Sequence, residues 1–151
     1  MGFLKAVCPG GARSMRETFC KGDFHFMTLE WINEPMSVCR LADFSGAQLN
    51  QPYVFAERTP DECSLVCPTR LAPANAEKRE DGWAMLRVVG TMEFSLVGVL
   101  AKISGALAAA NVGLFAVSTY DTDYILVKAE NKERAEAALA NAGCAWKSAA
   151  R

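Results

Sequence analysis

The chain has 151 residues, of which 51% are hydrophobic and 22% charged, and its formal net charge is -1. This composition is ordinary for a globular protein and excludes a chain that is disordered throughout. Acidic and basic residues nearly balance, without the basic stripe that nucleic-acid binding requires. Lys102, Ser104 and Gly105 interrupt the most apolar stretch, 96–110. The sequence therefore lacks the ~20 apolar residues of a membrane span. It also has no secretory signal, and we expect a cytoplasmic protein.

Six cysteines stand at positions 8, 20, 39, 63, 67 and 144. A disulfide framework is not expected in a cytoplasmic chain that can build an ordinary core. Cys63 and Cys67 form the one close pair, spaced C-x3-C, which fits half of a zinc site. The other half is missing, because His25 is the single histidine. We therefore predict buried structural thiols and no metal.

The first part of the chain is rich in short predicted strands. Residues 1–23 contain Pro9-Gly10-Gly11 and no hydrophobic period, so we predict a poorly ordered extension or a non-native start. Short apolar runs that alternate with turn residues predict strands at 24–29, 36–41, 53–56 and 64–67, and Asn33-Glu34-Pro35 is expected to separate the first two. Residues 73–82 are polar and turn-rich, and they are the best candidate for a linker between two halves.

The second part has a more regular pattern. Strands are predicted at 83–89, 114–117, 124–129 and 144–146. Apolar residues recur every three or four positions over 96–110 and predict a helix, which Asn111 and Gly113 end. A second helix is predicted from a cap at Asn131 to Ala142, with Gly143 as the residue that follows its C-cap.

The order of these elements predicts the fold class α+β. Strand, helix, strand, strand, helix, strand is the ferredoxin-like βαββαβ plan, an antiparallel sheet with both helices on one face. The strands are nearly all apolar, which predicts cover on both faces. The face without helices must then pack on the first half or on a second copy of the chain. The predicted division is an extension at 1–23, a strand-rich half at 24–72, a linker at 73–82 and the βαββαβ domain at 83–148.

Two motifs of this half resemble the ACT domain family. They are 97–103 (VGVLAKI) at the helix start and the more specific 118–127 (STYDTDYILV) in the following hairpin. Their order and spacing are similar to the small bacterial tandem-ACT proteins and the CASTOR arginine sensors, over about 27–146. Residues 57–66 resemble part of a first, paired ACT unit, so the strand-rich half is interpreted as a degenerate ACT-like half. The resemblance implies a protein that binds an amino acid or another small effector, regulates a partner and needs no cofactor.

The first predicted ligand-binding segment is the helix start, formed by Leu96, Val97, Gly98 and Val99. Backbone N–H groups at a helix N-terminus point outward and carry partial positive charge, which suits a carboxylate. Gly98 would let a ligand approach the backbone closely. Tight packing of the helix on the sheet explains Gly98 equally well.

The second segment is Gly113 and Leu114, where the helix ends and the next strand starts. By resemblance, these positions help to contact arginine in the CASTOR sensors. Those sensors have a serine where this chain has Gly113, so a hydroxyl group is lost here. The other interpretation of Gly113 is a helix C-cap.

The third segment is the predicted turn 119–123. By resemblance, Thr119, Tyr120 and Asp123 match ligand-contacting positions, and Tyr120, Asp121 and Asp123 also match a partner-binding patch. Two carboxylates and an aromatic ring suit an ammonium or guanidinium group. Turn formation explains the same residue types. The sequence leaves the two roles open.

No catalytic arrangement is visible in the sequence. His25 is the single histidine and lies near the poorly matched end of the chain, so we expect no Ser-His-Asp triad, and neither a phosphate-binding loop nor a metalloprotease motif occurs. We predict a non-catalytic sensor of a small molecule; the alternative is a module that binds a protein and no effector. The predicted helix 96–110 is almost uncharged and rich in alanine. It therefore predicts a homodimer, with the ligand at a seam between ACT-like units.

Overall fold

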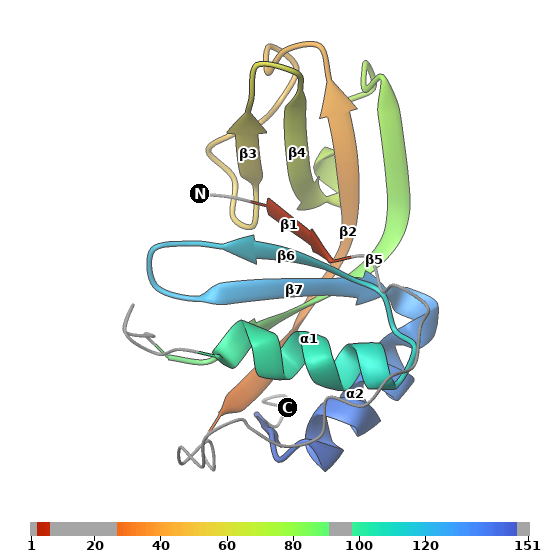
Figure 1. Cartoon of the computed structure of the whole chain (residues 1–151). Helices are drawn as coiled ribbons and strands as arrows, with labels where there is room; N and C mark the ends of the chain where they lie inside the picture. The colour runs from red at the N-terminus through yellow and green to blue at the C-terminus, as the bar shows by residue number, and fades with distance from the viewer. Residues whose placement is uncertain (1–2, 7–26, 91–97, 148–151) are drawn as a thin grey trace.

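A computed structural model describes residues 3–6, 27–90 and 98–147 (Figure 1). The strands are β1 (Phe3–Ala6), β2 (Thr28–Leu41), β3 (Phe55–Arg58), β4 (Cys63–Pro68), β5 (Lys78–Val88), β6 (Leu114–Ser118), β7 (Asp123–Lys128) and β8 (Ala145–Trp146). The helices are α1 (Val99–Ala109) and α2 (Lys132–Asn141), and the 3-10 turns are η1 (Thr69–Leu71) and η2 (Ala129–Asn131). The strands form one sheet in the order β1-β6-β7-β5-β2-β4-β3, with β8 beside β2. The α+β class predicted from the sequence is confirmed.

The second half follows the predicted βαββαβ order, β5-α1-β6-β7-α2-β8. Both helices lie on one face of the sheet (Figure 1), where Ile103, Leu107 and Leu139 are fully buried against Leu86 and Ile125. The last strand departs from the simple plan: β8 pairs in parallel with β2, which lies between β5 and β8. A strand from the first half of the chain thus stands inside the sheet of the second.

Both helices end in the same hydrogen-bonded cap. In α1, the N–H groups of Asn111 and Val112 donate to the carbonyls of Ala108 and Leu107, and Asn111 takes a φ of 55°. Gly143, with a φ of 90°, stands at the matching position after α2 and has the predicted role. The interpretation of Gly113 as the C-cap was wrong, because Asn111 already supplies the left-handed residue.

The long strands β2 and β5 run through both halves. Asn33-Glu34-Pro35 was expected to separate two strands, but it forms a bulge inside β2, opposite the single residue Ala84. Proline is tolerated there because the hydrogen-bond ladder is interrupted. A second irregularity follows in β5, where Gly82 has a φ of 77°. Residues 78–82 of the predicted linker are part of β5, so the sheet has no break at this point.

The first half repeats the strand plan of the second without its helices. In the order β3-β4-β2-β5 it has the same arrangement as β6-β7-β5-β2. β4 begins at Cys63 and β7 at Asp123, 60 positions later, and η1 and η2 keep the same offset. Loops stand in place of the helices: Phe44, Val54 and Leu71 pack on the thiol-rich core of this half. The sheet geometry is therefore that of two related units which share β2 and β5.

The bends in β2 and β5 turn the helix-free faces of the two halves toward each other (Figure 1). We call these two parts of the sheet the first leaf (β3, β4 and the adjoining parts of β2 and β5) and the second leaf (β6, β7 and the other parts of β5 and β2). Met36 and Val66 of the first leaf pack with Met85, Val117 and Leu126 of the second in one buried cluster. The face without helices is therefore covered by the first half of the same chain, one of the two predicted possibilities.

The remaining expectations concern the ends of the chain and the cysteines. Of the predicted extension 1–23, residues 3–6 form β1, which pairs with β6; the other residues lie outside the described ranges, as do Phe24 to Phe26. The thiols of Cys39, Cys63, Cys67 and Cys144 are buried, as predicted, and burial raises the pKa of Cys67 to about 12. Within the part of the chain that the structure describes, no helix is long and apolar enough to cross a membrane.

Candidate functional site

The predicted helix-start segment is only partly described. Leu96 and Val97 lie outside the described residues, and α1 begins two residues later. Gly98 is the N-cap residue, with a φ of 91°, and its carbonyl accepts the hydrogen bond of Lys102 N–H. A left-handed N-cap explains the glycine without reference to a ligand. Val99 points into the core and is 7% exposed, so its side chain contributes packing.

The turn between β6 and β7 is closed by Thr119. Its N–H and its hydroxyl group both donate to the carbonyl of Thr122 at 2.9 Å. The hydroxyl group of Thr122, which is buried, donates to the carbonyl of Val88 at 2.8 Å and fixes the turn to the end of β5. Tyr120 at the tip is 79% exposed, and Asp121 beside it is also exposed. Thr119 and Thr122 thus build the turn, while Tyr120 and Asp121 face outward.

Asp123 is held at the first position of β7. Its Oδ1 accepts a hydrogen bond from the hydroxyl group of Ser118 at 2.6 Å, across the antiparallel pair. Its second carboxylate oxygen has no hydrogen-bond partner among the described residues. The carboxylate is half-buried. It therefore has a fixed position and one oxygen free to accept a hydrogen bond from another molecule.

The first half contains the same turn. A comparison of the two turns shows which residues the turn itself requires. Thr59 N–H donates to the carbonyl of Glu62 at 2.9 Å, as Thr119 does to Thr122. Position 123, however, corresponds to Cys63 in the first half. A carboxylate is therefore not needed at this position for the turn to form.

Gly113 and Leu114 lie at the start of β6, and the turn lies at its end. The predicted residues thus form two groups, Gly98 with the 119–123 turn at one end of the strand and Gly113 with Leu114 at the other. Gly113 is exposed, and a Cβ atom added to it would meet no other atom within 4 Å. Leu114 is 8% exposed and belongs mainly to the core under the helices. Within one chain, the two groups do not form a single site.

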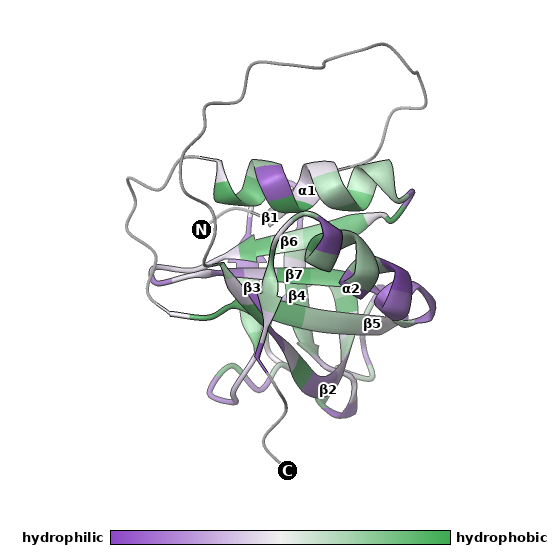
Figure 2. Ribbon diagram, turned by 90° about the horizontal axis from the view of Figure 1, so that it is seen from below, coloured by the Kyte–Doolittle hydropathy of each residue, from purple (hydrophilic) through white to green (hydrophobic). Residues whose placement is uncertain are grey.

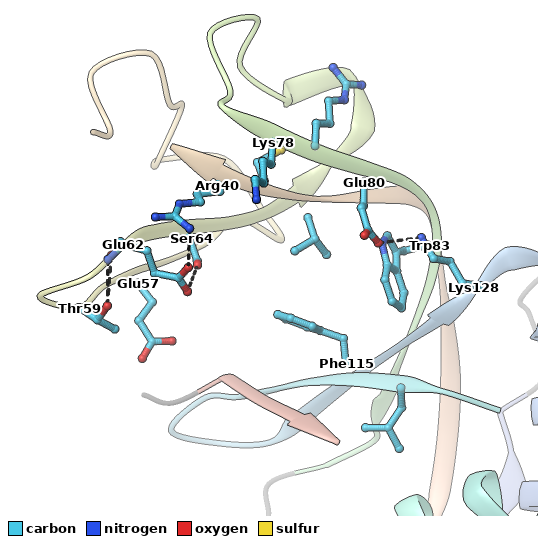
Figure 3. Close-up of a pocket in the computed structure, with 14 residues that line it drawn as sticks. Arg40, Glu57, Thr59, Glu62, Ser64, Lys78, Glu80, Trp83, Phe115 and Lys128 are labelled. Carbon is cyan, nitrogen blue, oxygen red and sulfur yellow. Dashed lines mark hydrogen bonds and ion pairs between the residues drawn. The ribbon is translucent and has the colours of Figure 1, made fainter. Parts of the chain in front are cut away.

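A pocket that the sequence analysis missed lies where the two leaves diverge (Figure 3). Its volume is about 600 Å3, within the range of ligand-binding pockets. We call it the inter-leaf pocket. Of the predicted site residues that the structure describes, Leu114 alone lines it. The other lining residues are Val38, Cys39, Arg40, Glu57, Thr59, Glu62, Ser64, Lys78, Arg79, Glu80, Trp83, Phe115 and Lys128.

Two kinds of surface line the inter-leaf pocket (Figure 3). Its second-leaf side is aromatic: Trp83 and Phe115 have ring centroids 6.3 Å apart, and the Lys128 Nζ lies 4.1 Å from the centroid of Trp83. Its first-leaf side has charged groups of both signs, the cations Arg40 and Lys78 and the carboxylates of Glu57 and Glu62. The pocket can therefore offer both an apolar contact area and charged hydrogen-bond donors to one small molecule.

The sequence alone could not assemble this pocket. Its residues come from six strands and from the turn between β3 and β4, and they meet because β2 and β5 bend at irregularities that the sequence did not place. One signal was present: Arg40, Ser64 and Lys78 are polar positions within or beside apolar strand runs. That these three residues lie side by side across the sheet follows only from the cross-strand register.

Comparison with known proteins gives one family match. Residues 78–141, from the start of β5 to the end of α2, match the family model ACT_7, an ACT domain. The match supports an ACT domain in this part of the chain. It coincides with the region whose motifs resembled that family. No curated protein sequence matches the chain.

Solved structures share the fold over most of the chain. A protein from Agobacterium tumefaciens has a TM-score of 0.72 and 29% identity, and the match covers 80% of this chain and 92% of that one. A protein of unknown function from Vibrio cholerae, a possible transport protein, has a TM-score of 0.62 and 20% identity, with 78% and 90% covered. The ligand-free regulatory subunit of aspartate kinase from Thermus thermophilus has a TM-score of 0.56 and 14% identity, and the match covers 76% of this chain and 95% of that one. The last two likenesses concern the fold alone.

Proposed function

We propose that this protein is a cytoplasmic, non-catalytic regulatory sensor that binds a small molecule, an amino acid. The observation that carries the proposal is the match of 78–141 to an ACT domain. The same region of the sequence contains the predicted ligand-binding residues, from Leu96 to Asp123. The described cysteines are free thiols, which fits a reducing compartment.

The chemistry near α1 suits the two charged groups of an amino acid. The N-terminus of α1 can attract a carboxylate through its partial positive charge. Asp123 keeps one carboxylate oxygen for an ammonium or guanidinium group, since Ser118 occupies the other. A carboxylate that is dispensable for the turn, as Cys63 at the related position indicates, is a reasonable ligand-binding residue.

A thermal-shift screen of the twenty amino acids tests this proposal. A ligand at 100 times its dissociation constant adds roughly 2.7 kcal/mol to the unfolding free energy. For a domain of this size, that is a shift of several degrees in melting temperature. Absence of a shift with every amino acid, checked by calorimetric titration, would refute an amino-acid sensor.

A second candidate function is a module that binds a protein and no effector. Tyr120, 79% exposed at the tip of its turn beside the exposed Asp121, favours this candidate. An exposed tyrosine supplies contact area and a polar group, which is typical of protein interfaces. Partner binding that Tyr120→Ala abolishes, in a protein that binds no amino acid, would support the module.

We also propose a homodimer, formed through the outer face of α1. Its exposed residues are Ala101, Gly105, Ala108 and Ala109, all small, whereas α2 has a hydrophilic outer face (Figure 2). Small side chains let another helix approach closely, and an exposed helix face normally has charges. Since the bare sheet face is covered within the chain, α1 is the remaining argument for the dimer.

Sedimentation equilibrium tests the dimer. We expect twice the 16.4 kDa of one chain at micromolar concentration. Ala108→Glu should produce a monomer, because a charge would be buried without a partner. Ala137→Glu on the exposed face of α2 is the matched control. A wild-type mass of one chain, with and without the amino acid found in the screen, would exclude the dimer. A monomeric variant that still binds the amino acid would exclude a ligand seam between chains.

A further inference from the structure

The two leaves each present one row of side chains on the faces that meet, and the rows correspond through the internal repeat. On the first leaf, the row is Glu57, Ser64, Arg40 and Lys78, in the order β3-β4-β2-β5. On the second leaf, it is Val117, Tyr124, Arg87 and Glu30, in the order β6-β7-β5-β2. Arg40 therefore corresponds to Arg87, and Lys78 corresponds to Glu30.

In the second leaf, the arginine of the row is neutralised within the protein. Arg87 faces Glu30 across the β5–β2 pair, and the Arg87 Nη2 lies 2.7 Å from the Glu30 Oε2. Lys147 Nζ contacts the other Glu30 oxygen at 3.0 Å. Hydrogen bonds from Arg87 and then Lys147 lower the pKa of the Glu30 carboxyl. This row needs no further anion.

In the first leaf, the same position has the opposite charge. Arg40 faces Lys78 across the pair, so two cations stand directly opposite each other. Arg40 reaches the carboxylates of Glu77 at 3.5 Å and Glu62 at 4.0 Å, but Lys78 forms no ion pair with any described residue. Like charges in facing positions destabilise a sheet. An anion bound between them would remove this repulsion and gain charge-assisted hydrogen bonds.

The aromatic side of the inter-leaf pocket lies across from these cations (Figure 3). Trp83 and Phe115 are half-buried, and Val38 lies between the charged row and the core that joins the leaves. Lys128 is held over the Trp83 ring by Glu80 at 3.2 Å, so it is already paired. The charged groups near the rings are thus internally balanced, and the rings offer an apolar contact area.

From these features we infer that the inter-leaf pocket binds an organic carboxylate with a flat apolar body. The carboxylate group lies against Lys78 and Arg40, whose donors match its oxygens. The apolar body lies on Trp83 and Phe115. This site is separate from the amino-acid site proposed around Asp123, and neither proposal depends on the other.

Three probes separate the parts of this ligand. They are 3-phenylpropionate, which has a carboxylate and a ring, 2-phenylethylamine, which has the ring and an ammonium group in place of the carboxylate, and acetate, which has the carboxylate alone. Binding is followed by NMR through the indole N–H signal of Trp83, assigned with Trp83→Phe. The signals of Trp31 and Trp146, which stack on each other elsewhere, are internal references. We expect 3-phenylpropionate to shift the Trp83 signal at millimolar or lower concentration, and the other two probes to bind at least tenfold more weakly.

Variants at the charged row complete the test. Lys78→Ala should weaken 3-phenylpropionate about tenfold or more, as expected for one charge-assisted hydrogen bond, and Lys78→Glu should abolish its binding. Lys132→Ala, on α2, is the matched control and should leave the affinity for the probe unchanged; the Trp31 signal will move in this variant, because the Lys132 Nζ lies 4.9 Å from the centroid of the Trp31 ring. Both Lys78 variants should fold, because each removes a repulsion. Asp123→Asn should leave this probe unaffected, which distinguishes the two sites. Equal binding of 2-phenylethylamine, or unchanged affinity in both Lys78 variants, would overturn the inference.

Discussion

The two halves of this chain share a strand order but are stabilised in different ways. The second half buries its sheet under α1 and α2, while the first half covers its sheet with loops around a cluster of thiols and aliphatic side chains. They also differ in charge. In the second half, Glu30 lies opposite Arg87 and neutralises it, whereas in the first half Lys78 lies opposite Arg40. The shared strands β2 and β5 therefore hold the fold together. In the half without helices, Arg40 pairs with Glu62 and Glu77, and Lys78 forms no ion pair with any described residue.

The largest expected effect concerns the two cores. Leu107→Ala in α1 and Leu65→Ala in β4 each remove a fully buried side chain and should cost about 2–5 kcal/mol of unfolding free energy. Because β2 and β5 belong to both halves, each variant should lower one common transition. Urea unfolding followed by circular dichroism and by tryptophan fluorescence would check this. Two separate transitions in either variant would mean that the halves are independent.

The difference between the related turns gives the next largest effect. Asp123→Asn should weaken the amino acid found in the screen by about 1.5–3 kcal/mol, the range for hydrogen bonds to charged groups. It should leave the melting temperature of the free protein nearly unchanged, since Cys63 occupies this position in the first-half turn. Calorimetric titration measures the loss, with Asp61→Asn in the other turn as the control. Unaltered affinity would leave Asp123 as a residue of the turn.

The sequence predicted the second half better than the first, and the reason is physical. In the second half, α1 and α2 show a helical period and end in Asn111 and Gly143, so local signals agree with the final packing. In the first half, the two runs around Asn33-Glu34-Pro35 belong to one strand, because tertiary pairing with β5 overrides a local turn signal.

The candidate sites also depend on tertiary pairing that local sequence signals do not predict. The motif 118–127 located a turn that the structure describes, but no motif in the sequence located the inter-leaf pocket. Its charged row joins Glu57, Ser64, Arg40 and Lys78, which lie up to 38 positions apart and become neighbours through register alone. A hydrophobic pattern predicts which face a residue takes, but not which residue stands opposite.

A reversal of the charge at position 78 tests whether the two rows differ in stability because of their charges. Lys78→Glu would reproduce the Glu30–Arg87 arrangement beside Arg40, and it should raise the unfolding free energy by about 0.2–1 kcal/mol. The reverse change in the second leaf, Glu30→Lys, should lower it by at least as much, because Arg87 and Lys147 would both lose their partner. Denaturant midpoints at low and high salt measure both. A destabilised Lys78→Glu variant would mean that Lys78 has a structural role.

The smallest expected effect is a pH dependence of the unfolding free energy, which comes from the carboxyl group of Glu30. Arg87 and Lys147 lower the pKa of Glu30 below its ordinary value of 4.5, so its ionised form is favoured in the folded state. This contribution to stability is present above pH 4.5 and is lost as the pH falls through the lower folded pKa. The stability difference between the wild type and Glu30→Gln should therefore be constant near neutral pH and shrink below 4.5.

Lys78→Glu should acquire the same acid sensitivity in the first leaf. Its new carboxyl group would face Arg40, so its pKa should fall in the folded state for the reason that the pKa of Glu30 does. The gain in stability over the wild type should then disappear as the pH drops below the ordinary range of a glutamate. Lys132→Glu on α2 is the control, since it creates a carboxyl group away from the row. A gain that persists in acid would show that removal of the Lys78 charge, and not a new pair with Arg40, stabilises the variant. In that case the two rows would match in geometry but not in electrostatics.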